Sequence, residues 1–314
     1  MKAIILNKAG EARNLTYADV PDPIIREEEV LIRVHSLSIN PVDLKARGSE
    51  ERLTGFYGNN RPVILGWDLS GTIEEVGKSV SDFKVGDEVF GMVNFPGNGS
   101  AYAEYVAAPT SHITLKPDNI SHPEAAAATL AALTAWQALV TNGKIKKDDK
   151  VLIHAASGGV GHYALQLARH FGAFVIGTSS AKNKDFVMKN GAEKHIDYTT
   201  KDFENEIDDV DFVLDAIGKD ITARSVNITR KGGKVISILG NSTPANVAIA
   251  ESKEVELSNM LVQSSATDMK SIADLMQKGI IKSHVSQTFL FREMVQAHLQ
   301  LETGRTVGKI IINL

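Results

Sequence analysis

The chain has 314 residues, of which 43% are hydrophobic and 23% charged, a composition typical of a globular protein long enough for two domains. Its 34 basic and 38 acidic residues give a net charge of −4, which offers no basic surface for nucleic acid or for an anionic membrane. Because the chain contains no cysteine, disulfides, thiolate catalysis and cysteine-ligated metals are excluded.

The first 120 or so residues have the composition of strands and turns. Apolar and β-branched residues recur over 30–34, 71–77 and 85–91, and glycine and aspartate fall between them at regular intervals. This pattern predicts a coiled antiparallel sheet or a partly open barrel.

The pattern changes at about Ser121. Pro123 begins an alanine-rich helix for which Ser121 is a suitable N-cap. Four short apolar runs, which we expect to be strands, then alternate with helical segments: 151–155, 174–178, 212–215 and 234–239. Such alternation predicts an α/β fold with a doubly wound parallel sheet. From about residue 257 the chain has a further helical pattern, a turn at 303–305 and a strand over 309–312.

Residues 151–161, Val-Leu-Ile-His-Ala-Ala-Ser-Gly-Gly-Val-Gly, run from a buried strand into a glycine turn. The turn fits G-x-G-x-x-G with Ala156, Gly158 and Gly161 at the small positions. Small residues let backbone N–H groups approach a pyrophosphate, and the N-terminus of the next helix, expected over 162–171, favours the negative charge. The sequence therefore predicts a dinucleotide site formed by Ser157, Gly158, Gly159, Val160 and Gly161.

The second strand of the parallel sheet indicates which dinucleotide binds. NAD sites place an acid about 20 residues after the glycine turn, where it accepts a hydrogen bond from the ribose 2′-hydroxyl. Here Ser179, Ser180, Lys182 and Lys184 occupy that region, and the first acid is Asp185. Hydroxyls and lysines would bind a 2′-phosphate that a carboxylate would repel, so we predict NADPH as the cofactor.

Four further motifs occur along the chain: Asn40-Pro41-Val42-Asp43, Gly86-Asp87-Glu88-Val89, Leu133-Thr134-Ala135-Trp136-Gln137-Ala138-Leu139 and Gly304-Arg305-Thr306-Val307-Gly308-Lys309. With them, the whole chain resembles the medium-chain dehydrogenase/reductase superfamily, and specifically its zinc-independent quinone oxidoreductase branch. The resemblance implies a GroES-like, partly open β-barrel domain for the substrate (1–122 and 258–314). It also implies a Rossmann domain for NADPH (123–257), with the nicotinamide between the two.

The resemblance assigns roles at the cofactor. It implies that Ser179 and Lys184 meet the 2′-phosphate and that Tyr198 lies along the adenosine half. Ile217 and Leu239 would lie beneath the nicotinamide, which agrees with the rule that ligands of doubly wound sheets bind at the carboxyl ends of strands. For Tyr198, simple packing is an alternative.

The resemblance also places Asn40 and Thr134 near the nicotinamide or the substrate, with simple packing as the alternative for Thr134. Where the zinc-dependent branch has a ligating cysteine, this chain has Asn40. Where that branch has Gly-His-Glu, this chain has Gly66-Trp67-Asp68. The nine histidines show no close spacing on a shared face. We therefore predict no metal, and an acceptor that is already electrophilic.

A quinone or the β-carbon of an α,β-unsaturated carbonyl accepts hydride without a metal, because the charge spreads onto oxygen. Asn40 is a candidate donor to that oxygen, and Tyr57, on the loop 54–60, is a candidate proton source or cleft wall. Either residue could instead be structural. The aromatic residues that would line a flat apolar cleft are Phe56, Tyr57, Trp67 and Phe95.

These observations favour an NADPH-dependent quinone or enone reductase. Two alternatives stay open, a 2-enoyl-thioester reductase of the same superfamily and a non-catalytic NADPH-binding protein with a structural or sensory role. Because the superfamily is often dimeric, we expect a homodimer. The N-terminal apolar run and the stretch 125–139 are too short for a signal peptide or a membrane span, so we expect a cytoplasmic protein.

Overall fold

The computed structural model describes residues 1–240 and 242–314 and divides the chain into two compact units. The first unit consists of residues 1–133 and 263–314, and the second of 134–262. The division differs from the boundaries predicted at 122/123 and 257/258. Helix α3 (His122–Ala127) packs on strands of the first sheet, so the chain leaves the first unit about ten residues later than its helical pattern suggested.

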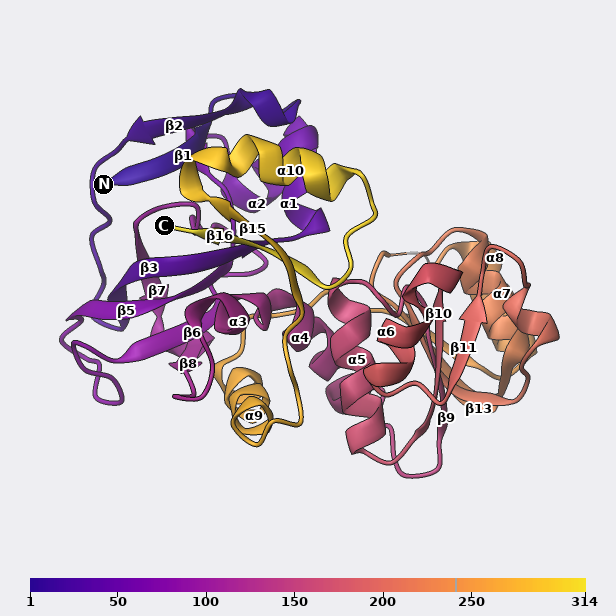
Figure 1. Cartoon of the computed structure of the whole chain (residues 1–314). Helices are drawn as coiled ribbons and strands as arrows, with labels where there is room; N and C mark the ends of the chain where they lie inside the picture. The colour runs from indigo at the N-terminus through magenta and orange to yellow at the C-terminus, as the bar shows by residue number, and fades with distance from the viewer. Residues whose placement is uncertain (241) are drawn as a thin grey trace. The chain divides into compact units, whose positions relative to one another are not determined.

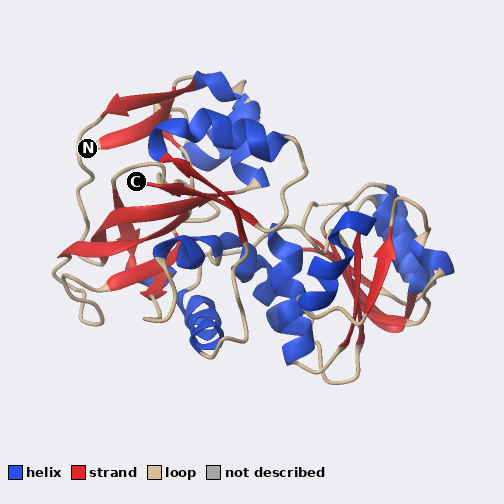
Figure 2. Ribbon diagram, viewed as in Figure 1, coloured by secondary structure: helices blue, strands red, loops and turns tan. Residues whose placement is uncertain are grey.

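The first unit is built mainly of strands (Figure 2). They are β1 (Lys2–Leu6), β2 (Leu15–Asp19), β3 (Glu29–Ile39), β4 (Val63–Ile64), β5 (Asp68–Val76), β6 (Glu88–Met92), β7 (Tyr105–Pro109), β8 (Ile113–Leu115), β15 (Val285–Leu290) and β16 (Lys309–Asn313). β1 lies between β2 and β4 in a three-stranded sheet, and the seven-stranded sheet runs β15-β16-β3-β5-β6-β8, with β7 also paired to β3. Among the described residues, the strand pairs of the first unit are antiparallel except β15 with β16, an arrangement that agrees with the predicted GroES-like lobe.

The helices of the first unit are α1 (Pro41–Gly48), α2 (Glu50–Tyr57), α3, α4 (Leu130–Trp136, which continues into the second unit), α9 (Ala266–Gln277) and α10 (Met294–Glu302). Three of these helices, α2, α3 and α9, begin at a serine whose side chain caps them. Ser121 caps α3 as predicted, in a reciprocal capping box with Glu124. The prediction of a loop over 54–60 was wrong for its first half. Ser49 caps α2, two glutamates favour its first turn, and the chain leaves the helix only at Gly58, whose φ is +75°.

The second unit is a six-stranded parallel sheet in the order β11-β10-β9-β12-β13-β14. Its strands are β9 (Lys150–Ile153), β10 (Phe174–Ser179), β11 (Lys194–Asp197), β12 (Val210–Asp215), β13 (Thr229–Ser237) and β14 (Glu256–Asn259). Its helices are the π-helical η3 (Gln137–Asn142), α5 (Gly159–His170), α6 (Lys184–Lys189), α7 (Asp220–Ile228) and α8 (Pro244–Ser252). Figure 1 shows α5 and α6 on one side of this sheet and α7 and α8 on the other, which confirms the doubly wound prediction.

The four predicted strands of this sheet are present, and β11 and β14 were not predicted. Both unpredicted strands lie at the edges of the sheet and contain a single large apolar residue each, Ile196 and Leu257. Within the 1–240 and 242–314 ranges, no helix combines the length and hydropathy needed to cross a membrane.

Candidate functional site

The glycine turn follows β9 at the carboxyl end of the parallel sheet. Helix α5 begins at Gly159, three residues earlier than predicted, with Gly158 as its N-cap. A Cβ added to Gly161 would lie 2.3 Å from the Ala155 carbonyl oxygen and 2.7 Å from the Ala156 Cα, so no side chain fits there. The helix therefore starts in direct contact with the segment that follows the strand, and residues 157–160 of the turn are partly exposed.

Asn183 joins this turn to the end of β10. Its Nδ2 lies 3.1 Å from the Ser157 hydroxyl and 3.5 Å from the Ser180 hydroxyl. Val160 is half-buried in the first turn of α5. The sequence reasoning missed Asn183, although its position between Lys182 and Lys184 in the predicted 2′-phosphate segment could have identified it.

Ser179, Lys184 and Tyr198 are brought together at the end of β10. The Ser179 side chain is buried, and its carbonyl oxygen accepts from the Tyr198 N–H at 3.4 Å. Lys184 is the exposed first residue of α6, which packs on β10 and β11. The Tyr198 side chain is 60% exposed, so it has space for a ligand on one face.

An acid that the sequence reasoning missed lies beside this cluster. Asp197 is the register partner of Ser179 on β11. Its carboxylate accepts from the Thr199 N–H at 3.0 Å, from the Thr199 hydroxyl at 2.8 Å and from the Thr200 hydroxyl at 3.3 Å. Because its oxygens bind this turn, Asp197 does not take the place of the ribose-binding acid of an NAD site.

Ile217 and Leu239 follow β12 and β13 at the same end of the sheet, 38% and 40% exposed. The fully buried Asp215 fixes the first of these loops, because its carboxylate accepts from the Ile217 N–H at 2.9 Å and from the Thr222 hydroxyl at 2.6 Å. Two apolar side chains thus stand exposed at strand ends, as a planar ring would require. Thr134 is buried on α4.

In the first unit, Asn40 belongs to a buried polar cluster. Its Nδ2 donates to Asp68 at 2.7 Å, and its Oδ1 accepts from the Lys309 ammonium. Lys309 also donates to the Ile39 carbonyl at 3.2 Å and lies 3.9 Å from Asp68. Asp43 accepts from the Asn40 N–H at 2.7 Å, which completes the cap of α1. The cluster, which we call the Asn40–Lys309 cluster, holds the amide in one orientation.

Burial dominates the electrostatics of the Asn40–Lys309 cluster. It lowers the pKa of Lys309 and raises the pKa of Asp68, although the attraction between the two groups opposes both shifts. Burial also raises the pKa of Asp43 to about 7, despite the hydrogen bond from the Asn40 N–H and the nearby Lys309. Asp43 is therefore half-protonated near neutral pH.

Replacing Asp43 with Asn should change how stability depends on pH. A carboxyl with a raised pKa binds more protons in the folded state, so it stabilises the fold at low pH, and this contribution is lost as the pH rises toward 7. We expect the free energy of unfolding of Asp43→Asn, relative to the wild type, to increase between pH 4.5 and pH 8. Urea unfolding at several pH values measures this difference in the free energy of unfolding. If the free energies of wild type and variant change with pH in the same way, Asp43 titrates normally.

Tyr57 and three other aromatic residues form a cluster. Ring centroids lie 5.5 Å apart for Tyr57 and Trp67, 5.3 Å for Phe56 and Trp67, and 5.0 Å for Trp67 and Phe95. The Tyr57 hydroxyl oxygen accepts from the Gly66 N–H at 3.1 Å. Burial raises the pKa of Tyr57 well above its usual value, so the phenol keeps its proton at neutral pH.

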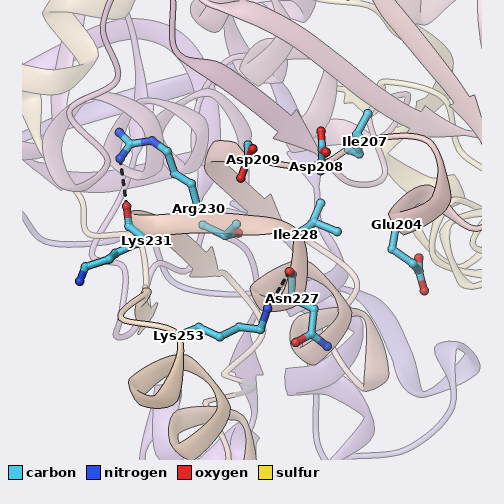
Figure 3. A pocket seen from close by; sticks show the side chains of 10 residues that line it. Glu204, Ile207, Asp208, Asp209, Asn227, Ile228, Arg230, Lys231 and Lys253 are labelled. Atoms are coloured by element: carbon cyan, nitrogen blue, oxygen red, sulfur yellow. Dashed lines mark hydrogen bonds between the residues drawn. The ribbon is translucent and has the colours of Figure 1, made fainter.

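A hollow of about 390 Å³ lies elsewhere in the second unit, at the amino ends of β12 and β13 (Figure 3). Its basic side chains bind neighbouring carbonyls, Lys253 that of Asn227 at 3.0 Å and Arg230 that of Lys231 at 3.0 Å. Because doubly wound sheets bind ligands at the carboxyl ends of their strands, we do not place the functional site here.

Across residues 1–240 and 242–314, no group of three or more histidine, aspartate or glutamate side chains is arranged to hold a metal ion. The polar groups of the first unit instead pair with one another in the Asn40–Lys309 cluster.

Comparisons with known proteins agree with this geometry. Residues 26–118 match the family described as alcohol dehydrogenase GroES-like domain, and residues 190–312 match the family described as zinc-binding dehydrogenase. The chain is 32% identical over 305 residues to 2-methylene-furan-3-one reductase of Solanum lycopersicum, covering 94% of this chain and 74% of that protein. It is also 32% identical to the chloroplastic NADPH-dependent alkenal/one oxidoreductase of Arabidopsis thaliana, covering 99% of this chain and 79% of that protein.

Among solved structures, the quinone oxidoreductase from Coxiella burnetii superimposes with a TM-score of 0.93 at 36% identity, covering 100% of this chain and 99% of that one. These relatives confirm the predictions of the family, of a hydride-transferring oxidoreductase and of NADPH as its cofactor. The chain belongs to the quinone oxidoreductase branch of the medium-chain dehydrogenase/reductase superfamily.

Proposed function

We propose that the chain reduces a quinone or an α,β-unsaturated carbonyl with NADPH and without a metal. The observation that carries this proposal is the arrangement at the carboxyl end of β9 and β10. There a glycine turn that excludes any side chain at Gly161 lies beside Ser179 and Lys184, and the carboxylate of Asp197 binds its own turn. The names of the relatives, an alkenal/one reductase and a quinone oxidoreductase among them, support the substrate class.

The residues of the second unit fit the bound cofactor, which supplies the hydride. The turn from Ser157 through Gly161 would hold the pyrophosphate with backbone N–H groups and the N-terminus of α5. Ser179 and Lys184 would bind the 2′-phosphate, and Tyr198 would lie along the adenosine. Two residues would support the nicotinamide from below, Ile217 and Leu239. Thr134 would lie near the nicotinamide.

In the first unit, Asn40 would stabilise the negative charge that develops on the substrate oxygen. Its Nδ2 carries two hydrogens, of which Asp68 accepts one, so the other is left to donate. Tyr57, neutral because of its burial, would provide a proton or a wall of the substrate site. The metal-free chemistry is supported by Asn40 and Trp67, an amide and an indole where zinc-dependent relatives need ligands.

The substrate class is tested by turnover of purified protein. We expect NADPH oxidation, followed by the loss of absorbance at 340 nm, with at least some members of a panel of quinones, enals and enones, and no loss of rate after dialysis against a chelator. Faster turnover of crotonyl-CoA than of every quinone and enone would favour a 2-enoyl-thioester reductase. Binding of NADPH without any turnover would leave a non-catalytic binding protein.

Lys184→Ala tests the choice of cofactor. Loss of the charge beside the 2′-phosphate should raise the KM for NADPH about tenfold or more, with little change in the weaker activity with NADH. Lys189→Ala, which removes an exposed lysine at the last residue of the same helix, is the matched control and should change neither KM. An equal loss with both cofactors would show that Lys184 does not contact the 2′-phosphate.

We further propose that the chain forms a homodimer and that it is located in the cytoplasm. Strand β14 ends the described order of the parallel sheet and offers an unpaired edge that a second copy could extend. Relatives named as chloroplastic show that the location differs within the family. Light scattering coupled to gel filtration tests the dimer, and a tagged chain imaged in its own cell tests the location.

A further inference from the structure

His195 lies on β11, next to the proposed 2′-phosphate site. Its Nε2 is 2.8 Å from the Ser179 hydroxyl oxygen. The register pairs His195 with Gly177 of β10, whose Cβ direction points at Val187 of α6. Because paired residues of parallel neighbours face the same side of a sheet, His195 lies on the α6 side, where Lys184 begins the helix.

The hydrogen bonds of Ser179 indicate how the ring is protonated. The single hydroxyl proton of Ser179 can bind the Ser180 carbonyl, 3.2 Å away. Nε2 of His195 is then the donor to the Ser179 oxygen, and Nδ1 is the nitrogen that gains or loses a proton.

Burial and two charged neighbours affect the pKa of this ring. Burial lowers the pKa of His195 below 6.5, Lys184 lowers it further, and Asp197, two residues along the same strand, opposes them. The Asp197 carboxylate is bound by Thr199 and Thr200, and Ser179 is uncharged. Without a ligand, the ring is therefore mostly neutral at pH 7. A phosphate dianion beside Lys184 and His195 would stabilise the imidazolium and so raise the pKa of His195.

We propose that His195 is a specificity-determining residue, which takes up a proton when NADPH binds and supplies a second positive charge to the 2′-phosphate. The proposal rests on the assignment of Ser179 and Lys184 to that phosphate. It implies that preference for the phosphorylated cofactor weakens as the pH rises, because an imidazolium is harder to form above neutral pH whereas the Lys184 ammonium persists.

The test measures binding of adenosine 2′,5′-bisphosphate and of adenosine 5′-phosphate by calorimetry, in wild type and in His195→Gln. Glutamine keeps a donor for Ser179 and carries no charge. We expect the variant to bind the bisphosphate about tenfold more weakly at pH 6.5 and nearly as well as the wild type at pH 9. Affinity for adenosine 5′-phosphate should be unchanged at both pH values, and thermal unfolding confirms that the variant is folded.

Proton uptake gives a second readout. At pH 7.5 the 2′-phosphate is already mostly a dianion, since its second pKa is about 6. Titrations in two buffers of different ionisation enthalpy should therefore show uptake of a fraction of a proton with the bisphosphate in the wild type and none in His195→Gln. His195→Lys, which carries a permanent charge, should restore affinity without proton uptake.

The outcomes separate this proposal from the one it rests on. If the wild type binds both adenosine nucleotides equally, the assignment of the 2′-phosphate site fails. If Lys184→Ala loses the preference and His195→Gln keeps it at pH 6.5, only the role of His195 is overturned. Equal weakening of both nucleotides by His195→Gln would also overturn it, because the ring would then shape the adenosine site and not read the phosphate.

Discussion

Lys309→Met is expected to lower the free energy of unfolding by about 3–5 kcal/mol, because it leaves Asp68 buried without its counter-charge. The Lys309 side chain is 3% exposed and Asp68 is fully buried, so water cannot replace the lost ammonium. At the same time the Oδ1 of Asn40 would lose the hydrogen bond that it accepts from Lys309, and the amide would lose its fixed orientation. Differential scanning calorimetry should show the unfolding midpoint of the first unit reduced by roughly 10 °C.

A double-mutant cycle distinguishes an unpaired charge from lost packing. Lys309→Met combined with Asp68→Asn removes both charges and should recover more than half of the stability that the single lysine change loses. Lys231→Met is the matched control. It removes a lysine that is paired with Glu254 at 2.6 Å on the surface, where an ion pair contributes about 0–1 kcal/mol. A Lys309→Met protein as stable as this control would contradict the pairing.

Gly161→Ala is expected to weaken NADPH binding by a factor of about one hundred or more. The new Cβ would lie 2.3 Å from the Ala155 carbonyl oxygen, a distance that can relax only if α5 moves away from β9. Moving the helix displaces the N–H groups of the turn, and the overpacking should cost about 3 kcal/mol of stability. Titration of NADPH fluorescence measures the affinity, and urea unfolding measures the stability.

Substitutions of two other glycines serve as comparisons for Gly161→Ala. Gly158→Ala places its Cβ 3.2 Å from the same carbonyl, which is tight but tolerable, so it should fold well and bind NADPH more weakly than the wild type. Gly55→Ala, in α2, meets no atom within 4 Å and should bind NADPH normally while gaining up to about 1 kcal/mol. Unchanged affinity in both Gly161→Ala and Gly158→Ala would show that the turn does not hold the pyrophosphate.

Features that depend only on a short stretch of sequence were predictable. The glycine turn, the cap at Ser121 and the four interior strands of the parallel sheet each follow from local composition, and the structure confirms them. The helix over Glu50–Tyr57 was missed because Gly55 and Gly58 suggested a loop. Ser49 followed by two glutamates was the local signal that outweighed them.

Features that depend on distant partners were not predictable. Asn40 was identified by its motif, but its partners stand 28 and 269 positions away and meet it only because β5 and β16 both pair with β3. His195 was overlooked for a related reason. The strand β11 carries only one large apolar residue, so nothing local showed that its alternating side chains would face the segment after β10.

The insertion of β16 between β15 and β3 also bears on how the chain is made. Residues 134–262 form a compact unit from one continuous segment, whereas the first unit needs β16, from the second of its two segments, to complete its seven-stranded sheet. Until Lys309 arrives, Asp68 and Asp43 have no cation to bury beside them. During synthesis, the second unit can therefore be complete before β16, which fills its place in the sheet of the first unit and carries the cation that pairs with Asp68, has been translated.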